Sequence, residues 1–330
     1  MQENHLAVLE SECYEDIDQL LGHKETRYFG QGFKQVSYQI IEHQFHPEQF
    51  SFHAIVDVAY PSSWSKKGEK GLTPHLSTID AMWLNCYACE QLLNAFFDMS
   101  EEVVLPLFRS VEMKAGQEPE EILSGVSLAV RLLDTVRIKE FYTYRSTLQI
   151  EVGSMKLQTI IEHGGVKRQT PVLMNANDET FFPFHYTDQC YRTIDPKNYH
   201  EIIQIQFRQD MKHIQGRMNI SKSSAHPLCF LSPIEVIISL AQLAQALIYK
   251  RDNLNRKDSE TLWMRTVLLE NFTHYYDMND CLVNVWMEKD RSVTKHGETW
   301  RMYRMLGTLG SSRCSYSLAH KLPSNTSENS

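Results

Sequence analysis

Two matching helix starts, 155 positions apart (231 − 76), constrain the fold of this sequence more than any other feature. Leu76-Ser77-Thr78-Ile79-Asp80 begins an apolar run that ends near Phe97, and Leu231-Ser232-Pro233-Ile234-Glu235 begins one that ends near Tyr249. In each copy an acidic residue follows a hydroxyl residue by three positions, and apolar residues then recur at helical spacing. Both runs are apolar over much of their circumference, so we expect each helix to be wrapped by a sheet.

Two further matches follow in the same order. Arg109-Ser110-Val111 matches Arg265-Thr266-Val267 with an offset of 156 (265 − 109), and the segment 152–163 matches 309–320 with an offset of 157 (309 − 152). Three ordered matches with nearly constant offsets indicate a duplicated domain.

The order of predicted elements is the same in both copies. Extended segments at 36–41 and 52–60 precede the first helix, and several β-branched or aromatic segments follow it without intervening helices. This order predicts an α+β fold in which each half is an antiparallel sheet around one long apolar helix. We place the first half at 1–165, the linker and lead-in at 166–200, the second half at 201–323, and a disordered tail at 324–330.

Composition excludes several classes of function. A net charge of −8 and a pI near 6.0 disfavour nucleic acid as a partner. No apolar run is long and uncharged enough to span a membrane, and no signal peptide is visible, so we expect a cytoplasmic protein with reduced cysteines. Cys86-x-x-Cys89 lies within the first apolar helix without a second pair, which indicates core residues and no metal site. No cofactor is expected.

A curled sheet around one apolar helix, used in pairs, is the hot-dog architecture. The helix starts Ile79-Asp80-Ala81 and Ile234-Glu235-Val236 resemble those of the hydroxyacyl-thioester dehydratases, in which a histidine lies upstream. His75 is five residues before Asp80 and His226 nine before Glu235, both closer than in that family, and the Gly-Asn-Pro loop is missing. The resemblance therefore implies the double hot-dog fold and does not carry over dehydratase chemistry.

A second resemblance covers nearly the whole chain. Four ordered segments are similar to the avirulence D (AvrD) family: 16–30, 73–80, 258–265 and 319–322. This resemblance implies a role in making syringolides, which are acyl glycosides assembled from a 3-oxoacyl thioester and a pentulose-type sugar. The partners it implies are a thioester of coenzyme A or of an acyl carrier protein, and the sugar.

The candidate catalytic residues lie at the two helix starts. Acyl transfer to a sugar hydroxyl, followed by aldol-type ring closure, needs a base and a stabiliser of the oxyanion. In a paired hot-dog fold the sites lie between the halves, so the expected pairs are His75 with Glu235 and His226 with Asp80. We favour the first pair, because His75 directly precedes its helix. The N–H groups at a helix start are the expected oxyanion donors.

A structural interpretation of the same residues stays open. Ser77-x-x-Asp80 and Ser232-Pro233-Ile234-Glu235 have the pattern of capping boxes, which alone explains each acid, and His75 can be a packing residue. Arg109 and Arg265 recur at equivalent strand positions, where a guanidinium can bind a substrate phosphate or carboxylate. An ion pair at the sheet edge, or with a helix-start acid, is the preferred interpretation of both arginines.

The sequence thus favours an enzyme of the acyltransferase or condensing type that acts on acyl thioesters. Two alternatives stay open: a dehydratase or thioesterase of the same fold, and a non-catalytic acyl-binding protein. The duplication makes the chain an intramolecular pseudo-dimer, and a homodimer of whole chains is compatible with it.

Overall fold

Two long helices organise the protein. The computed structural model describes residues 12–61, 66–67, 70–71, 73–99, 106–138, 143–172, 199–221, 231–271, 281–295 and 297–323. The helices are α2 (Thr78–Phe96) and α3 (Pro233–Arg251). Each begins at its predicted capping box: Ser77 and Asp80 exchange side-chain and backbone hydrogen bonds, as do Ser232 and Glu235. Both acids therefore cap their helices, as the pattern predicts.

Each helix is buried on nearly all sides. In α3 all but three of the nineteen residues are buried, and the exceptions are Gln245, Lys250 and Arg251. A helix without a polar face must be covered by other elements. In the described part of the chain, no helix is long and apolar enough to cross a membrane.

The covering element is an antiparallel sheet that the structure describes as thirteen strands. The strands of the first half are β2 (Ser37–His46), β3 (Ser51–Ala59), β7 (Leu107–Lys114), β8 (Val126–Arg137), β9 (Tyr144–Val152) and β10 (Met155–His163). Those of the second half are β12 (Tyr199–Phe207), β13 (His213–Ser221), β14 (Trp263–Asn271), β15 (Cys281–Lys295), β16 (Glu298–Leu309) and β17 (Ser312–Lys321). The thirteenth strand, β1 (Cys13–Asp16), pairs with β12 at one edge.

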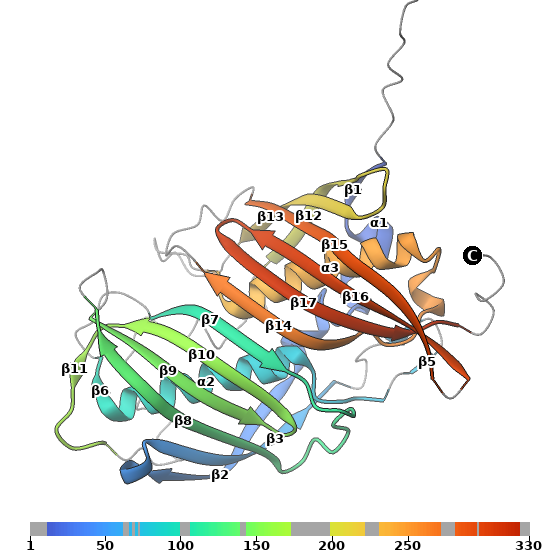
Figure 1. Ribbon diagram of the computed structural model, residues 1–330. Helices are drawn as coiled ribbons and strands as arrows, with labels where there is room; N and C mark the ends of the chain where they lie inside the picture. The colour runs from blue at the N-terminus through green and yellow to red at the C-terminus, as the bar shows by residue number, and fades with distance from the viewer. Residues whose placement is uncertain are drawn as a thin grey trace, which may run out of the picture.

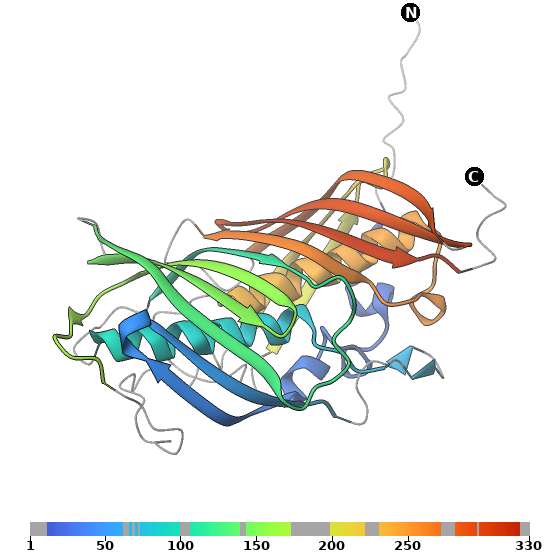
Figure 2. The same cartoon turned by 60° about the horizontal axis from the view of Figure 1, so that its bottom comes forward.

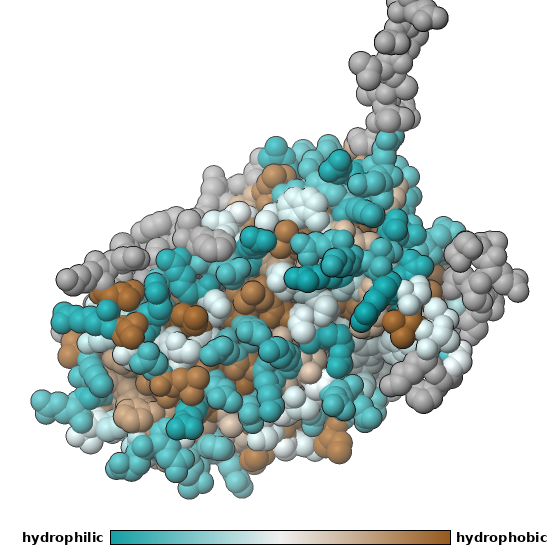
Figure 3. Space-filling model, viewed as in Figure 1, coloured by the Kyte–Doolittle hydropathy of each residue, from teal (hydrophilic) through white to brown (hydrophobic). Residues whose placement is uncertain are grey.

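Both halves have the same topology. The strand order is β2-β3-β8-β9-β10-β7 in the first half and β12-β13-β15-β16-β17-β14 in the second. Figures 1 and 2 show one helix lying across the concave face of each half. This arrangement confirms the predicted double hot-dog fold. On the outer face hydrophilic and hydrophobic side chains are intermixed (Figure 3).

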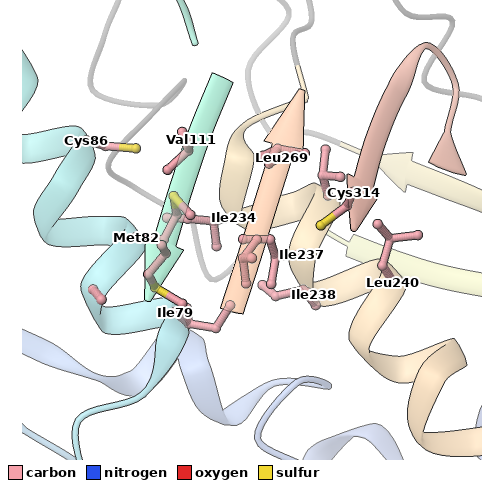
Figure 4. Packing of buried hydrophobic residues seen from close by; sticks show 14 of the residues in the cluster. Ile79, Met82, Cys86, Val111, Ile234, Ile237, Ile238, Leu240, Leu269 and Cys314 are labelled. Carbon is pink, nitrogen blue, oxygen red and sulfur yellow. The ribbon is translucent and has the colours of Figure 1, made fainter. Parts of the chain in front are cut away.

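The two halves join through β7 and β14, which lie in the middle of the sheet. Glu112 pairs with Leu268, and these two residues are equivalent in the repeat (112 + 156 = 268). Lys114 pairs with Thr266 and Ser110 with Glu270, which is symmetric about that pair. The register thus places a pseudo-twofold axis between the halves. Beside the junction of β7 and β14, Ile79 and Met82 of α2 lie near Ile234 and Ile237 of α3 (Figure 4).

The N-terminal segment packs on the second half. β1 pairs with β12, and α1 (Asp18–Leu21) contacts α3. The short helices η1 (Lys24–Thr26) and η2 (Gly32–Gln35) then lead the chain to β2. The division of the chain at 165 and 201 stays a prediction. Residues 13–21 precede this division in the sequence but contact the second half.

The remaining elements are short. They are η3 (Pro47–Gln49), η4 (Arg256–Asp258), and the two-stranded pairs β4 (Lys66–Lys67) with β5 (Lys70–Gly71) and β6 (Phe97–Asp98) with β11 (Val166–Lys167).

Truncation of a central helix residue tests the importance of helix burial. Leu84 of α2 has no exposed surface, so Leu84→Ala should lower the free energy of unfolding by about 2–5 kcal/mol. Leu282 of β15 is 50% exposed, and Leu282→Ala should change it by less than about 0.5 kcal/mol. Urea unfolding measures both. Equal losses in the two variants would contradict a fold that depends on the wrapped helix.

Candidate functional site

A cavity of about 130 Å³ lies between the two halves. The first half contributes the start of α2, the loop after β7 and the β9–β10 turn; the second half contributes one face of α3, η4 and the start of β14. The lining includes Arg27, Tyr28, His75, Ser77, Thr78, Glu118, Glu120, Ile237, Arg256, Leu262, Met264, Arg265 and Leu318. A site between the halves is what the paired fold predicts.

Backbone contacts hold the first-half wall in place. The Ala115 N–H donates to the Arg265 carbonyl at 3.0 Å, which ties the loop after β7 to β14. The Leu76 N–H donates to the Glu120 carbonyl at 2.8 Å, and the Ser154 N–H donates to the Glu120 carboxylate at 3.0 Å. The cavity wall is therefore fixed at the start of α2 and at the strand of the other half.

His75 lines this cavity, just before α2. Its Nδ1 lies 3.2 Å from the Thr73 carbonyl, and its ring lies 4.6 Å from the ring of Trp263 in the other half. Burial lowers the pKa of the imidazole below its ordinary value of 6.5, although nearby carboxylates, including Asp80, oppose this shift. A neutral imidazole at pH 7 is able to accept a proton.

Asp80 lies behind this wall, fully buried. Its carboxylate accepts hydrogen bonds from the Ser77 N–H at 2.7 Å and from the hydroxyl groups of Tyr38 at 2.7 Å and Tyr60. The Tyr28 hydroxyl lies 2.8 Å from Ser77 Oγ and 3.4 Å from the carboxylate. Burial raises the pKa of the Asp80 carboxyl, and the hydrogen bonds offset part of this rise. Because Tyr28 and Ser77 line the cavity, they connect it to Asp80.

Glu235 has a different histidine beside it from the one predicted. His200 Nε2 of β12 lies 3.3 Å from Glu235 Oε1, and both side chains are 4% exposed. Glu235 is not among the described residues that line the cavity, whereas His75 is. Glu235 thus lies outside the described lining that contains His75, and the expected pairing of these two residues stays a prediction. His226, the expected partner of Asp80, lies outside the described residues.

His200 and Tyr38 occupy equivalent positions. Tyr38 pairs with Val58 across β2 and β3, and His200 pairs with Ile220 across β12 and β13, so one offset of 162 relates both pairs (200 − 38; 220 − 58). Each contacts the acid at its own helix start. Because 166–200 is predicted to be the linker and lead-in, His200 is not among the predicted site residues. The signal available was the aromatic-apolar alternation around it, which is weak without the repeat alignment.

The two equivalent arginines lie in different environments. Arg109 Nε is 3.3 Å from the buried Glu162 carboxylate, and its Nη1 donates to the Asn271 carbonyl at 3.0 Å. Arg109 thus forms the ion pair that is the preferred interpretation of its sequence position. It is not among the described residues that line the cavity. Arg265 does line the cavity. In the described part of the chain its guanidinium contacts no carboxylate within 4.0 Å.

Two arginines that the sequence analysis did not select also line the cavity. Arg27 is 4% exposed, is paired with Asp18, and donates to Gln242 Oε1 of α3 at 2.7 Å. Arg256 of η4 donates to the Thr26 carbonyl at 3.2 Å. As for metals, the described residues contain no group of three His, Cys, Asp or Glu side chains that is able to hold an ion.

Fold and site together define a double hot-dog protein with a cavity between its halves. Solved structures with similar architecture include a tesB protein of Mycobacterium avium subsp. paratuberculosis (10% identity, 84% of this chain and 96% of that one, TM-score 0.41). They also include the 12:0-ACP thioesterase of Umbellularia californica (8% identity, 82% and 95%, TM-score 0.42). At such identities the similarity assigns no chemistry to this chain.

The family is shown by sequence. The model of the family described as Pseudomonas avirulence D protein (AvrD) matches residues 12–323, and the chain belongs to this family. The resemblance inferred from four segments is thereby confirmed. No curated protein matches the sequence.

The raised pKa of Asp80 predicts the sign of a pH effect on stability. Near pH 3.8, its ordinary pKa, the unfolded chain begins to release this proton, whereas the folded protein keeps it to higher pH. The free energy of unfolding should therefore fall as the pH rises from 3.8 to the folded pKa, by up to about 1.36 kcal/mol per unit. Asp80→Asn removes this titration, so the stability advantage of the wild type over the variant should shrink with rising pH.

Urea unfolding of both proteins between about pH 4 and 7 measures this difference. Asp134→Asn, at an exposed position of β8, is the control for an ordinary carboxylate. An advantage of the wild type that grows with pH would mean that the folded protein holds Asp80 ionised, against the effect of its burial.

Proposed function

We propose that this protein is a biosynthetic enzyme that forms an acyl glycoside of the syringolide type from a 3-oxoacyl thioester and a pentulose-type sugar. The observation that carries the proposal is the cavity between the halves, where a half-buried histidine of lowered pKa lies beside the start of a helix. Family membership supports the same product class. The thioester is one of coenzyme A or an acyl carrier protein, and the reaction takes place in the cytoplasm.

The second half supplies an apolar wall for the acyl chain. The apolar lining from this half includes Ile237 of α3, Leu262 just before β14, Met264 of β14 and Leu318 of β17. An acyl chain along this wall would leave water, which stabilises its binding. Its thioester carbonyl would then lie toward α2.

His75 is the proposed general base. Its neutral imidazole takes the proton of a sugar hydroxyl as the oxygen attacks the thioester carbonyl. The carbon–sulfur bond then breaks, the ester forms, and the imidazolium returns the proton to the departing thiolate. The neutral imidazole can next remove a proton from the carbon between the two carbonyl groups. The resulting carbanion attacks the sugar ketone and closes the ring, and the imidazolium returns the proton to the former ketone oxygen, which becomes a hydroxyl group.

The start of α2 is the proposed oxyanion site. Ser77 Oγ accepts the N–H groups of Ile79 and Asp80, and Asp80 accepts the N–H of Ser77. The N–H of Thr78, which lines the cavity, has no acceptor among the described residues. It is therefore left to donate to the carbonyl oxygen as negative charge develops, assisted by the helix dipole. The buried Asp80 holds Ser77 and Tyr28 in place beside it.

Incubation of the protein with a 3-oxoacyl thioester and a pentulose tests the proposal. We expect release of the thiol together with a sugar–acyl adduct, detected by mass spectrometry. Free acid or an enoyl thioester without an adduct would instead identify a thioesterase or a dehydratase. Absence of both thiol release and adduct would contradict an enzymatic role and favour an acyl-binding protein.

His75→Ala should lower the rate of adduct formation by about 10²–10⁴-fold, because the general base is lost. His213→Ala is the matched control: this histidine also packs on a tryptophan, Trp286, but on β13 away from the cavity. It should leave the rate unchanged, with thermal unfolding as the check on folding for both.

The pH dependence of the rate is a second measure of His75. Activity requires the neutral imidazole, so it should fall on acidification through an apparent pKa below 6.5, and the wild type should be fully active at pH 7. An acidic limb centred above 6.5, or an unchanged limb in His75→Ala, would exclude His75 as the base.

A further inference from the structure

The polar part of the cavity has a composition that the acyl chemistry does not explain. Arg256 and Arg265 of the second half line it together with Glu118 and Glu120 of the first. These opposite charges do not neutralise each other directly, because no ion pair within 4.0 Å joins them among the described residues. Burial of a guanidinium without a carboxylate is costly. Arg256 and Arg265 are both half-buried, so their lack of a carboxylate partner among the described residues indicates an anionic ligand.

Arg27 strengthens this inference from a third segment. Its side chain is 4% exposed and lines the same cavity, and its Nε has no acceptor in the described structure. Asp18 and Gln242 engage its two terminal nitrogens. Arg27 thus carries a buried donor that remains for a ligand, and its position is fixed by α1 and α3.

The glutamates indicate what else the ligand contains. Glu120 is held by the Ser154 N–H, and Glu118 lies at the exposed rim. Carboxylates next to a bound anion would repel it unless hydroxyl groups lie between them, since hydroxyl groups donate to carboxylates. A ligand with an anionic end and a polyhydroxyl body satisfies both sets of side chains.

We propose that Arg256 and Arg265 bind a phosphate ester and that the sugar substrate enters the cavity as its phosphate. The guanidinium fork is suited to phosphate oxygens, and a free pentulose offers no charge to either arginine. This inference rests on the proposed function, because it names the form of the sugar that the same cavity takes. Coenzyme A carries phosphate esters too, so the thioester is the other source of this group.

Calorimetric titration of the full chain separates the two sources. Xylulose 5-phosphate should bind at least about tenfold more tightly than xylulose, and inorganic phosphate should compete with it. Arg256→Gln and Arg265→Gln should each remove most of this preference, whereas Arg313→Gln, an exposed arginine of β17, should not. In the second arm, the affinities of the coenzyme A and pantetheine thioesters of the same acyl chain are measured with the same proteins.

Equal affinity for xylulose and xylulose 5-phosphate would overturn the inference. It would also be overturned if the two arginine substitutions weakened the binding of the coenzyme A thioester alone. Arg265→Lys checks folding independently, since it keeps the charge and should retain part of the preference. Binding needs no turnover, so the outcomes stay distinct from those of the proposed function. If the adduct forms equally well from xylulose and from its phosphate, the phosphate inference is refuted and the proposed enzymatic function stands. If the sugar phosphate binds tightly but no adduct forms, the phosphate inference stands and the proposed enzymatic function is refuted.

Discussion

The structure depends on the burial of two helices that have no polar face. Leu84, Leu92, Leu243 and Leu247 are fully buried, and such helices are stable in water only when a sheet encloses them. Each half supplies six strands for this purpose, and the halves then join through β7 and β14 at their common edge. The cavity follows from that junction, because the start of α2 and the face of α3 meet there across the pseudo-twofold axis (Figures 2 and 4).

The duplicated framework carries different chemistry in its two halves. At the helix starts, Tyr38 contacts Asp80 whereas His200 contacts Glu235. At the helix ends, His163 packs on Phe97 and lies 2.8 Å from Ser146 Oγ, and burial lowers its pKa to about 4. The equivalent His320 lies 3.0 Å from the Asp252 carboxylate and 3.2 Å from the Tyr303 hydroxyl. Duplication conserves the positions of these side chains. Of the two helix starts, however, only that of α2 lines the cavity among the described residues.

The sequence predicted the elements that repeat and missed the contacts that cross between them. The capping boxes at Ser77 and Ser232 and the offset between the copies were sufficient to predict the fold. Local hydrogen bonds and helical periodicity depend on residues that are close together in the sequence. The pairing of His200 with Glu235 and the approach of Arg27 to Gln242 join residues far apart in the chain. Only the strand register and the crossing of the N-terminal segment to the second half determine them, and neither has a local signal.

A crystal structure with a non-hydrolysable 3-oxoacyl thioester analogue would test the central claim most directly, that the cavity at the start of α2 is the active site. We expect the carbonyl oxygen of the analogue to lie within hydrogen-bonding distance of the Thr78 N–H, with His75 beside it and the acyl chain along the apolar wall of α3 and β14. An analogue bound at the start of α3, beside His200 and Glu235, or outside the cavity would contradict it.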